Sequence, residues 1–186
     1  MRVIAGSARR LLLKTLPGND TRPTTDMIKE TLFNMINFDL PGSRFLDLYA
    51  GSGAIGIEAL SRGASFCTFV DNNAKAAAVI RENVEHTHFT DQSDIITSEA
   101  VSALRRLENT SEPYDFVFLD PPYDQGMEDS ALRYLKSSKL LHTNSSIIVE
   151  MSINADIEHF NDLGFLIDKV KSYKTNKHVF LRRRAE

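Results

Sequence analysis

The sequence has few of the residues that mark disulfide-rich, metal-binding or membrane-spanning proteins. Cys67 is the only cysteine in 186 residues, which excludes a disulfide framework and a cysteine zinc site. The five histidines are scattered and form no metal-binding pattern, so surface or helix-end positions are expected for them. No apolar run approaches the length of a membrane span. We therefore expect a cytoplasmic monomer with no metal and no membrane partner.

The start of the chain and its composition fit one soluble domain. Residues 1–6 turn polar too soon for a signal peptide, so none is expected. Hydrophobic residues make up 42% and charged residues 25% of the chain, which is ordinary for a globular protein. We predict a single domain, residues 1–186, in which a basic N-terminal extension of residues 1–40 precedes a core of residues 41–186.

Charge is distributed unevenly along the chain. The net charge of −3 combines +4 in residues 1–22, +5 in residues 167–186 and −12 between them. An acidic body with two basic ends favours a nucleic-acid surface where those ends meet, although a solvated basic tail is the alternative. The basic residues expected to contact RNA phosphates are Arg9, Arg10, Lys14, Arg22, Arg182, Arg183 and Arg184.

The hydrophobic pattern predicts an α/β fold. One or two short strands with a turn near residues 6–7 are expected in residues 1–16, followed by a helix that Thr24 or Thr25 caps and that ends near residue 38. Strands are then expected at 45–49, 66–71, 94–97, 114–119 and 146–150, and helices at 52–62, 73–85, 101–107, 127–137 and 155–163. We predict that the chain ends in an antiparallel hairpin, formed by residues 165–173 and 178–183. Alternating strands and helices indicate a parallel sheet with helices on both faces.

A rigid polar turn follows the predicted strand at 114–119. In Asp120-Pro121-Pro122-Tyr123 the prolines fix φ and end the strand at its carboxyl end, where open α/β sheets bind ligands. The Asp120 carboxylate and the Pro121 carbonyl can each accept one N–H of an amino group on a heterocycle, and Tyr123 can stack on that base. We predict that Asp120, Pro121, Pro122 and Tyr123 form the catalytic set; the alternative is a strand-ending turn without chemistry.

A glycine-rich turn follows the strand at 45–49. The spacing Gly51-x-Gly53-x-x-Gly56 is weakly specific, because dinucleotide-binding proteins share it, and Asp71 could accept ribose hydroxyls of either cofactor. Asp47, inside the strand end, favours a cofactor with an ammonium and a sulfonium group, which S-adenosylmethionine has. The predicted cofactor-binding residues are Asp47, Tyr49, Ala50, Gly51, Ser52, Gly53, Asp71, Asn72, Glu99, Ala100 and Asp120.

These motifs resemble class I S-adenosylmethionine-dependent methyltransferases, and within them the bacterial RsmD family of small-subunit rRNA guanine-N2 methyltransferases. The resemblance rests on residues 2–6, on Arg22-Pro23-Thr24-Thr25 with residues 32–34, on residues 47–53 and on residues 120–123. It implies a Rossmann-like fold whose seven-stranded, mostly parallel sheet has an antiparallel last strand. It also implies methyl transfer to the N2 amine of a guanine in 16S rRNA, within the small ribosomal subunit or an assembly intermediate.

Three other functions remain open from the sequence. A DNA adenine-N6 methyltransferase uses a similar acid-Pro-Pro-aromatic turn, but this chain has no room for a separate target-recognition domain. A nicotinamide oxidoreductase would share the glycine turn. An RNA-binding assembly factor could keep a relic cofactor pocket without catalysis, although the intact turn at residues 120–123 argues against this.

Overall fold

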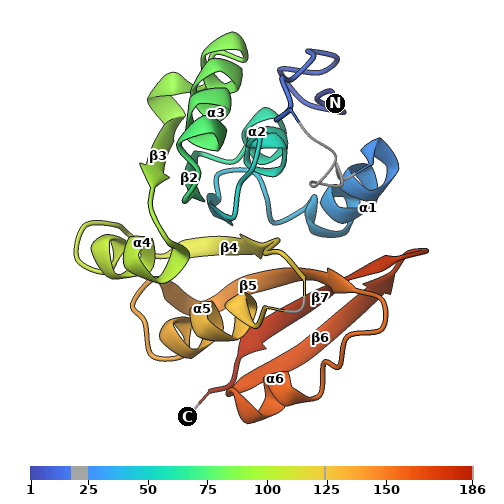
Figure 1. Ribbon diagram of the computed structural model, residues 1–186, viewed down its shortest axis with the longest axis vertical. Helices are drawn as coiled ribbons and strands as arrows, with labels where there is room; N and C mark the ends of the chain where they lie inside the picture. The colour runs from blue at the N-terminus through green and yellow to red at the C-terminus, as the bar shows by residue number, and fades with distance from the viewer. Residues whose placement is uncertain (18–24, 124, 186) are drawn as a thin grey trace. The chain divides into compact units, whose positions relative to one another are not determined.

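The computed structural model of the protein describes residues 1–17, 25–123 and 125–185 (Figure 1). The chain divides into two compact units, Met1–Glu99 and Ala100–Glu186. The single-domain organisation with an extension of residues 1–40 stays a prediction. Among the described residues, no helix is both long and apolar enough to pass through a membrane.

The first unit contains three parallel strands with their connecting helices. Its elements are α1 (Asp26–Ile36), β1 (Arg44–Leu48), α2 (Ala54–Ser61), β2 (Phe66–Asp71), α3 (Ala74–His86), a short 3-10 helix (Thr90–Gln92) and β3 (Ser93–Thr97). Strand β2 pairs in parallel with both β1 and β3. Each strand is therefore followed by a chain reversal at the same edge, and the turns after β1, β2 and β3 are neighbours there.

The second unit contains four strands, of which one runs against the others. Its elements are α4 (Ala100–Leu107), β4 (Tyr114–Leu119), α5 (Met127–Leu135), β5 (Leu141–Ser152), α6 (His159–Asp162), β6 (Phe165–Ser172) and β7 (Asn176–Arg183). Strands β4 and β5 are parallel, whereas β7 is antiparallel to β5 and to β6. Strand β6 is the outer strand on this side, and its last five residues are exposed (Figure 1).

Most predicted elements are found within one or two residues, and two differ for identifiable reasons. Strand β5 begins at Leu141, earlier than predicted, because Ser145 hydrogen-bonds backbone groups where the register between β4 and β5 shifts. Its Oγ donates to the Tyr114 carbonyl at 2.7 Å and accepts from the His142 amide at 2.9 Å. The helix expected at 155–163 is reduced to α6, because Lys177 Nζ donates to the Ala155 carbonyl at 2.6 Å and residues 155–157 are not helical. Thr25 caps α1 as predicted, through the Ile28 amide.

The predicted hairpin of residues 1–16 is present in a short form. Its antiparallel arms are joined by the bridge between Arg2 and Leu12 and by three backbone hydrogen bonds of 2.9 Å, from the Val3 amide to the Leu11 carbonyl, from Arg10 to Val3 and from Leu13 to Met1. The pairing stays short among the described residues, because the next amides, those of Ile4, Ala5 and Ala8, bind side chains of α2. Glu58 and Ser61 provide these acceptors.

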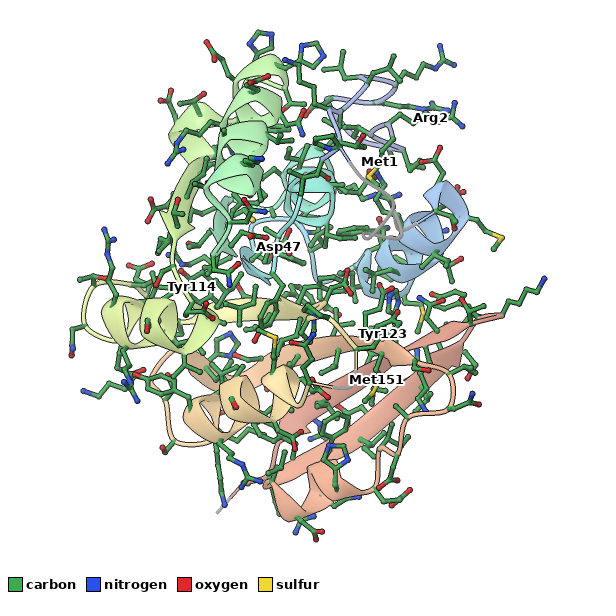
Figure 2. The ribbon with its side chains drawn as sticks, in the orientation of Figure 1. Met1, Arg2, Asp47, Tyr114, Tyr123 and Met151 are labelled. Carbon is green, nitrogen blue, oxygen red and sulfur yellow. The ribbon has the colours of Figure 1, made fainter. Side chains whose placement is uncertain are left out.

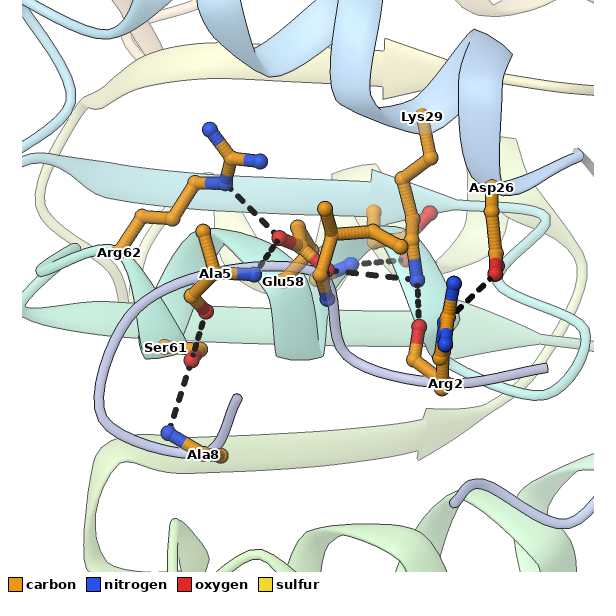
Figure 3. Close-up of polar contacts among 11 residues, drawn as sticks. Arg2, Ala5, Ala8, Asp26, Lys29, Glu58, Ser61 and Arg62 are labelled. Carbon is orange, nitrogen blue, oxygen red and sulfur yellow. Dashed lines mark hydrogen bonds and ion pairs between the residues drawn. The ribbon is translucent and has the colours of Figure 1, made fainter. Parts of the chain in front are cut away.

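Glu58 is the centre of a buried polar network that holds the N-terminal segment on α2 (Figure 3). Its carboxylate is fully buried and accepts from the amides of Ile4 at 2.9 Å and Ala5 at 3.0 Å. Arg62 Nε lies 2.8 Å and Lys29 Nζ 3.3 Å from it. Burial lowers the pKa of Lys29, and the Glu58 charge opposes that shift. The Glu58 charge would be costly to bury without these partners, so its contacts hold α1, α2 and the N-terminal segment together.

Gly6 makes the closest backbone approach in this network. Its φ is +83°, and a Cβ placed on it would lie 1.7 Å from the Ser61 carbonyl oxygen. The adjacent Ser7 amide donates to that same oxygen at 2.8 Å. A residue with a side chain therefore cannot occupy position 6 while the segment stays docked.

Gly6→Ala should release the N-terminal segment and destabilise the protein by clearly more than Gly42→Ala. Gly42 has a similar φ of +80°, and a Cβ added there would meet nothing within 4 Å, so it reports the backbone strain alone, about 1–2 kcal/mol. Urea unfolding gives the free energies, and limited proteolysis reports accessibility of residues 1–16. Equal losses in the two variants would contradict the close packing of Gly6.

Candidate functional site

The glycine-rich turn after β1 has three residues in the left-handed region. Gly51 and Gly53 have φ of +57° and +79°, and Tyr49 has φ of +65°, which is uncommon for a residue with a side chain. The Gly53 amide donates to the Ala50 carbonyl at 2.7 Å, and the Ala50 amide donates to the Val70 carbonyl at 2.9 Å. A Cβ on Gly51 would meet nothing within 4 Å, so a ligand can approach the backbone there.

Asp71, at the end of β2, fixes the shape of this turn. Its Oδ2 accepts from the Gly51 amide and its Oδ1 from the Asn73 amide, both at 2.9 Å. The side chain is half-buried, and a carboxylate retains further lone pairs after two such bonds. Asp71 thus both shapes the turn and keeps acceptor capacity for hydroxyl groups.

Asp47 lies behind the turn and is almost completely buried, with 1% of its surface exposed (Figure 2). Its Oδ2 accepts from the Gly56 amide at 3.0 Å, which holds the first turn of α2 against β1. Burial raises the pKa of Asp47 to about 7, the charge of Asp71 adds to the shift, and the Gly56 hydrogen bond opposes it. The geometry gives Asp47 a role in building the turn; its predicted contact with a cofactor stays a prediction.

The ends of β2 and β3 bring two further predicted residues together. Asn72 Nδ2 donates to Glu99 Oε1 at 2.8 Å, and both side chains are exposed. The Ser98 amide donates to the Asp71 carbonyl at 3.0 Å, which joins the two turns. Ala100 is the buried first residue of α4. The first-unit candidates, apart from buried Asp47 and Gly53, are therefore at least partly exposed at the carboxyl ends of the strands.

Asn83 is a site residue that the sequence did not reveal. It is 1% exposed on α3, accepts from the Lys14 amide at 2.8 Å, and donates to the Lys14 carbonyl at 3.0 Å and the Ser52 carbonyl at 2.9 Å. One amide group thereby joins the N-terminal segment to the glycine turn. The only signal in the sequence is a polar residue within the apolar face of the helix.

Asp120-Pro121-Pro122-Tyr123 follows β4 in the second unit, as predicted. Pro121 is buried, Pro122 is exposed, and Asp120 and Tyr123 are half-buried. Figure 2 labels Tyr123 and Met151, which line the same small pocket. The residues around this pocket are Pro121, Pro122, Tyr123, Glu128, Glu150, Met151, Ser152 and Ala155.

His178 is fully buried, so the expectation that the histidines lie at the surface or at helix ends is wrong for it. It lies opposite Glu150 in the β5–β7 register, and its Nε2 is 3.0 Å from Glu150 Oε2. Asn176 Nδ2 donates to Glu150 Oε1 at 2.9 Å, and the Tyr123 hydroxyl lies 3.4 Å from the same oxygen. These partners satisfy a carboxylate that burial would otherwise penalise.

The predicted RNA-binding residues differ in their surroundings. Arg9 and Arg10 are exposed on the N-terminal segment, and Lys14 pairs with Glu82 on α3. Arg182 pairs with Asp168, whereas the Arg183 guanidinium donates to the carbonyls of Ser138 at 2.9 Å and Leu141 at 3.0 Å. Arg184 is exposed. Arg22 lies outside the described residues.

The fold and sequence match known methyltransferases. Residues 1–181 match the family described as "Conserved hypothetical protein 95". The chain is 39% identical over 150 residues to "Putative rRNA methyltransferase YlbH" of Bacillus subtilis, covering 81% of this chain and 82% of that one. It is 35% identical over 150 residues to "Ribosomal RNA small subunit methyltransferase D" of Buchnera aphidicola, covering 80% and 76%. The solved structure of "Putative methyltransferase yhhF from Escherichia coli" aligns over 100% of this chain and 99% of that one, with a TM-score of 0.84 and 28% identity.

The predicted α/β fold is confirmed as the Rossmann-like fold of class I methyltransferases. Its seven described strands include a parallel set and the antiparallel β7. The chain belongs to the family described as "Conserved hypothetical protein 95", the RsmD family, as the resemblance implied.

The free energy of unfolding of the wild type should contain a term that falls as pH rises from about 4 to about 7. Native Asp47 keeps its proton up to a pKa of about 7, whereas the unfolded chain releases it near 3.8, so the native state binds more protons between those values. Each pKa unit corresponds to about 1.4 kcal/mol. Asp47→Asn still accepts from Gly56 and cannot titrate, so this term should be missing.

Urea unfolding of both proteins at about pH 4 and about pH 8 measures the difference, because all other titrating groups are common to them. Asp47→Asn should gain stability relative to the wild type at the higher pH. An identical pH dependence in the two proteins would show that Asp47 titrates normally in the folded state.

Proposed function

We propose that the protein is a cytoplasmic S-adenosylmethionine-dependent methyltransferase that modifies the exocyclic N2 amine of a guanine in 16S rRNA. The observation that carries this proposal is the acid-Pro-Pro-aromatic turn at the carboxyl end of β4, in a chain that also has the glycine turn after β1. Relatives named as small-subunit rRNA methyltransferases support the small ribosomal subunit as partner.

The first unit fits the cofactor. The open space at Gly51 admits a ligand to the backbone, and half-buried Asp71 has lone pairs left for ribose hydroxyls. Exposed Glu99, the last residue of this unit, can accept from an adenine amino group, and the amide of the next residue in the chain, Ala100, is the proposed backbone donor. S-adenosylmethionine supplies an electrophilic methyl group on a positively charged sulfur. Tyr49, Ala50, Ser52, Gly53 and Asn72 complete the proposed cofactor site.

The second unit fits the acceptor. An exocyclic amine on a base is planar and a weak nucleophile, because its lone pair is delocalised into the ring. Asp120 and the Pro121 carbonyl accept its two N–H bonds, orient the nitrogen and stabilise the positive charge that develops on it. Tyr123 stacks on the base, which must leave its helix to reach the turn. No covalent enzyme intermediate is required.

The exposed basic residues bind the RNA backbone. Arg9, Arg10 and Lys14 in the first unit, and Arg182 and Arg184 in the second, are the proposed phosphate contacts, together with Arg22. The Arg183 guanidinium holds two backbone carbonyls, so in the folded state its main role is structural and its contribution to RNA binding is the smallest of the set.

Asp120→Ala should lower the rate of methyl transfer by about 100-fold or more, because it removes an acceptor aimed at the reacting amine. Binding of S-adenosylmethionine, measured by calorimetry, should largely survive. Asp129→Ala is the matched control, since Asp129 is an acid of the same unit that forms a half-buried pair with His159. Near wild-type methylation by Asp120→Ala would refute the assigned role.

The substrate is tested by offering small ribosomal subunits, naked 16S rRNA and duplex DNA with labelled S-adenosylmethionine. Mass mapping of the product should find methylguanine in the rRNA and no methyladenine in the DNA. Calorimetry with NAD should show no binding, which separates the methyltransferase from an oxidoreductase. Methylation of none of these substrates would favour a non-catalytic RNA-binding factor.

A further inference from the structure

Glu150 is a nearly buried carboxylate beside the catalytic turn whose position has no role in the mechanism above. In the parallel pairing of β4 and β5, Leu119 is opposite Val149, so Asp120 and Glu150 are the next residues on the two strands. Glu150 lines the same pocket as Pro121, Pro122 and Tyr123. Asp120, the first residue after β4, and Glu150, within β5, are therefore neighbours beside the proposed base site.

Hydrogen-bond donors face both carboxylate oxygens of Glu150. The Tyr173 hydroxyl lies 3.3 Å from His178 Nδ1, and burial, with the Glu150 charge, raises the pKa of Tyr173 to about 12. A protonated tyrosine donates to Nδ1, which leaves Nε2–H to donate to Glu150 Oε2. Asn176 and Tyr123 donate to the other oxygen, Glu150 Oε1.

The carboxylate has capacity for one more donor. An ionised carboxylate offers about four lone-pair sites, and three side chains, His178, Asn176 and Tyr123, occupy one each. The Tyr123 contact, at 3.4 Å, is long and weak, and it comes from the pocket side. A ligand in the pocket with an N–H on its edge can therefore bind Glu150 without breaking the His178 and Asn176 bonds.

We propose that Glu150 accepts a hydrogen bond from N1–H of the guanine whose N2 amine is held by Asp120 and the Pro121 carbonyl. Guanine carries N1–H and N2–H₂ as adjacent donors on the edge that also bears O6, and these two donors match two adjacent carboxylates. Adenine has a lone pair at N1, which the Glu150 carboxylate repels. Glu150 is thus the specificity-determining residue of the acceptor site. The inference rests on the proposed function and deepens it.

The competing explanation is structural: Glu150 and His178 face each other across β5 and β7 and join these strands. Both explanations predict that removing the side chain is harmful, so loss of activity alone does not separate them. Only base recognition predicts a change in selectivity between bases that carry the same reacting amine.

The test uses small subunits reconstituted with 16S rRNA that carries either guanine or 2,6-diaminopurine at the methylated position. The analogue keeps the N2 amine but has a lone pair in place of N1–H. Wild-type enzyme should methylate guanine about 5- to 150-fold faster, measured as kcat/KM, because one hydrogen-bonded base contact gives discrimination of about this size. Glu150→Gln should bring the ratio close to one, since its amide can donate to N1 of the analogue.

Glu128→Gln is the matched control, because Glu128 is the other glutamate of the pocket and should keep the wild-type ratio. S-adenosylmethionine binding of Glu150→Gln should equal that of the wild type, whereas its unfolding temperature should be lower, because the new NH2 group faces one of the donors that Glu150 accepts from. Equal use of both bases by wild-type enzyme, an unchanged ratio in Glu150→Gln, or a lost ratio in Glu128→Gln overturns the inference.

Equal use of the two bases by the wild type overturns the inference even if Glu150→Gln does not fold. Failure of the proposed function is a different result. In that case the wild type methylates neither base in any ribosomal substrate, and both proposals fall together.

Discussion

The buried carboxylate of Glu58 is the constraint on which the first unit depends. A charge without access to water is stable only when donors surround it, and here two backbone amides, an arginine and a lysine do so. The two amides belong to the N-terminal segment, the lysine to α1, and the arginine follows the last residue of α2. The positions of the N-terminal segment, α1 and α2 are therefore fixed together, and α2 begins at the glycine turn.

Carboxylates at the ends of parallel strands are used in two different ways. In the first unit, Asp47 and Asp71 accept from backbone amides, so they give the glycine turn a fixed shape. In the second unit, Glu150 accepts from side chains and borders a pocket. Backbone partners build a rigid scaffold, whereas side-chain partners leave room for a ligand to join them. This difference agrees with the proposed division into a cofactor unit and an acceptor unit.

The sequence predicted the fold well, because periodicity and breakers report on local structure. It predicted β2 and β4 with their observed limits, and it identified the turns after β1 and β4. It did not reveal the Glu58 network, Asn83 or the buried His178. Each of these depends on a partner more than 25 residues away, which no local pattern encodes. In residues 1–16 the sequence indicated the short hairpin but not its docking on Glu58 and Ser61 of α2, which again depends on distant partners.

The exposed outer strand β6 has a consequence for solubility. An outer strand presents unpaired amides and carbonyls that can recruit a strand from another molecule. Here Lys169 and Lys171 flank the half-exposed Val170, and Arg182 pairs with Asp168 across to β7. A second copy approaching this edge would have to bring its own lysines against these charges. The basic C-terminal region thus also protects the protein from edge-to-edge aggregation at high concentration.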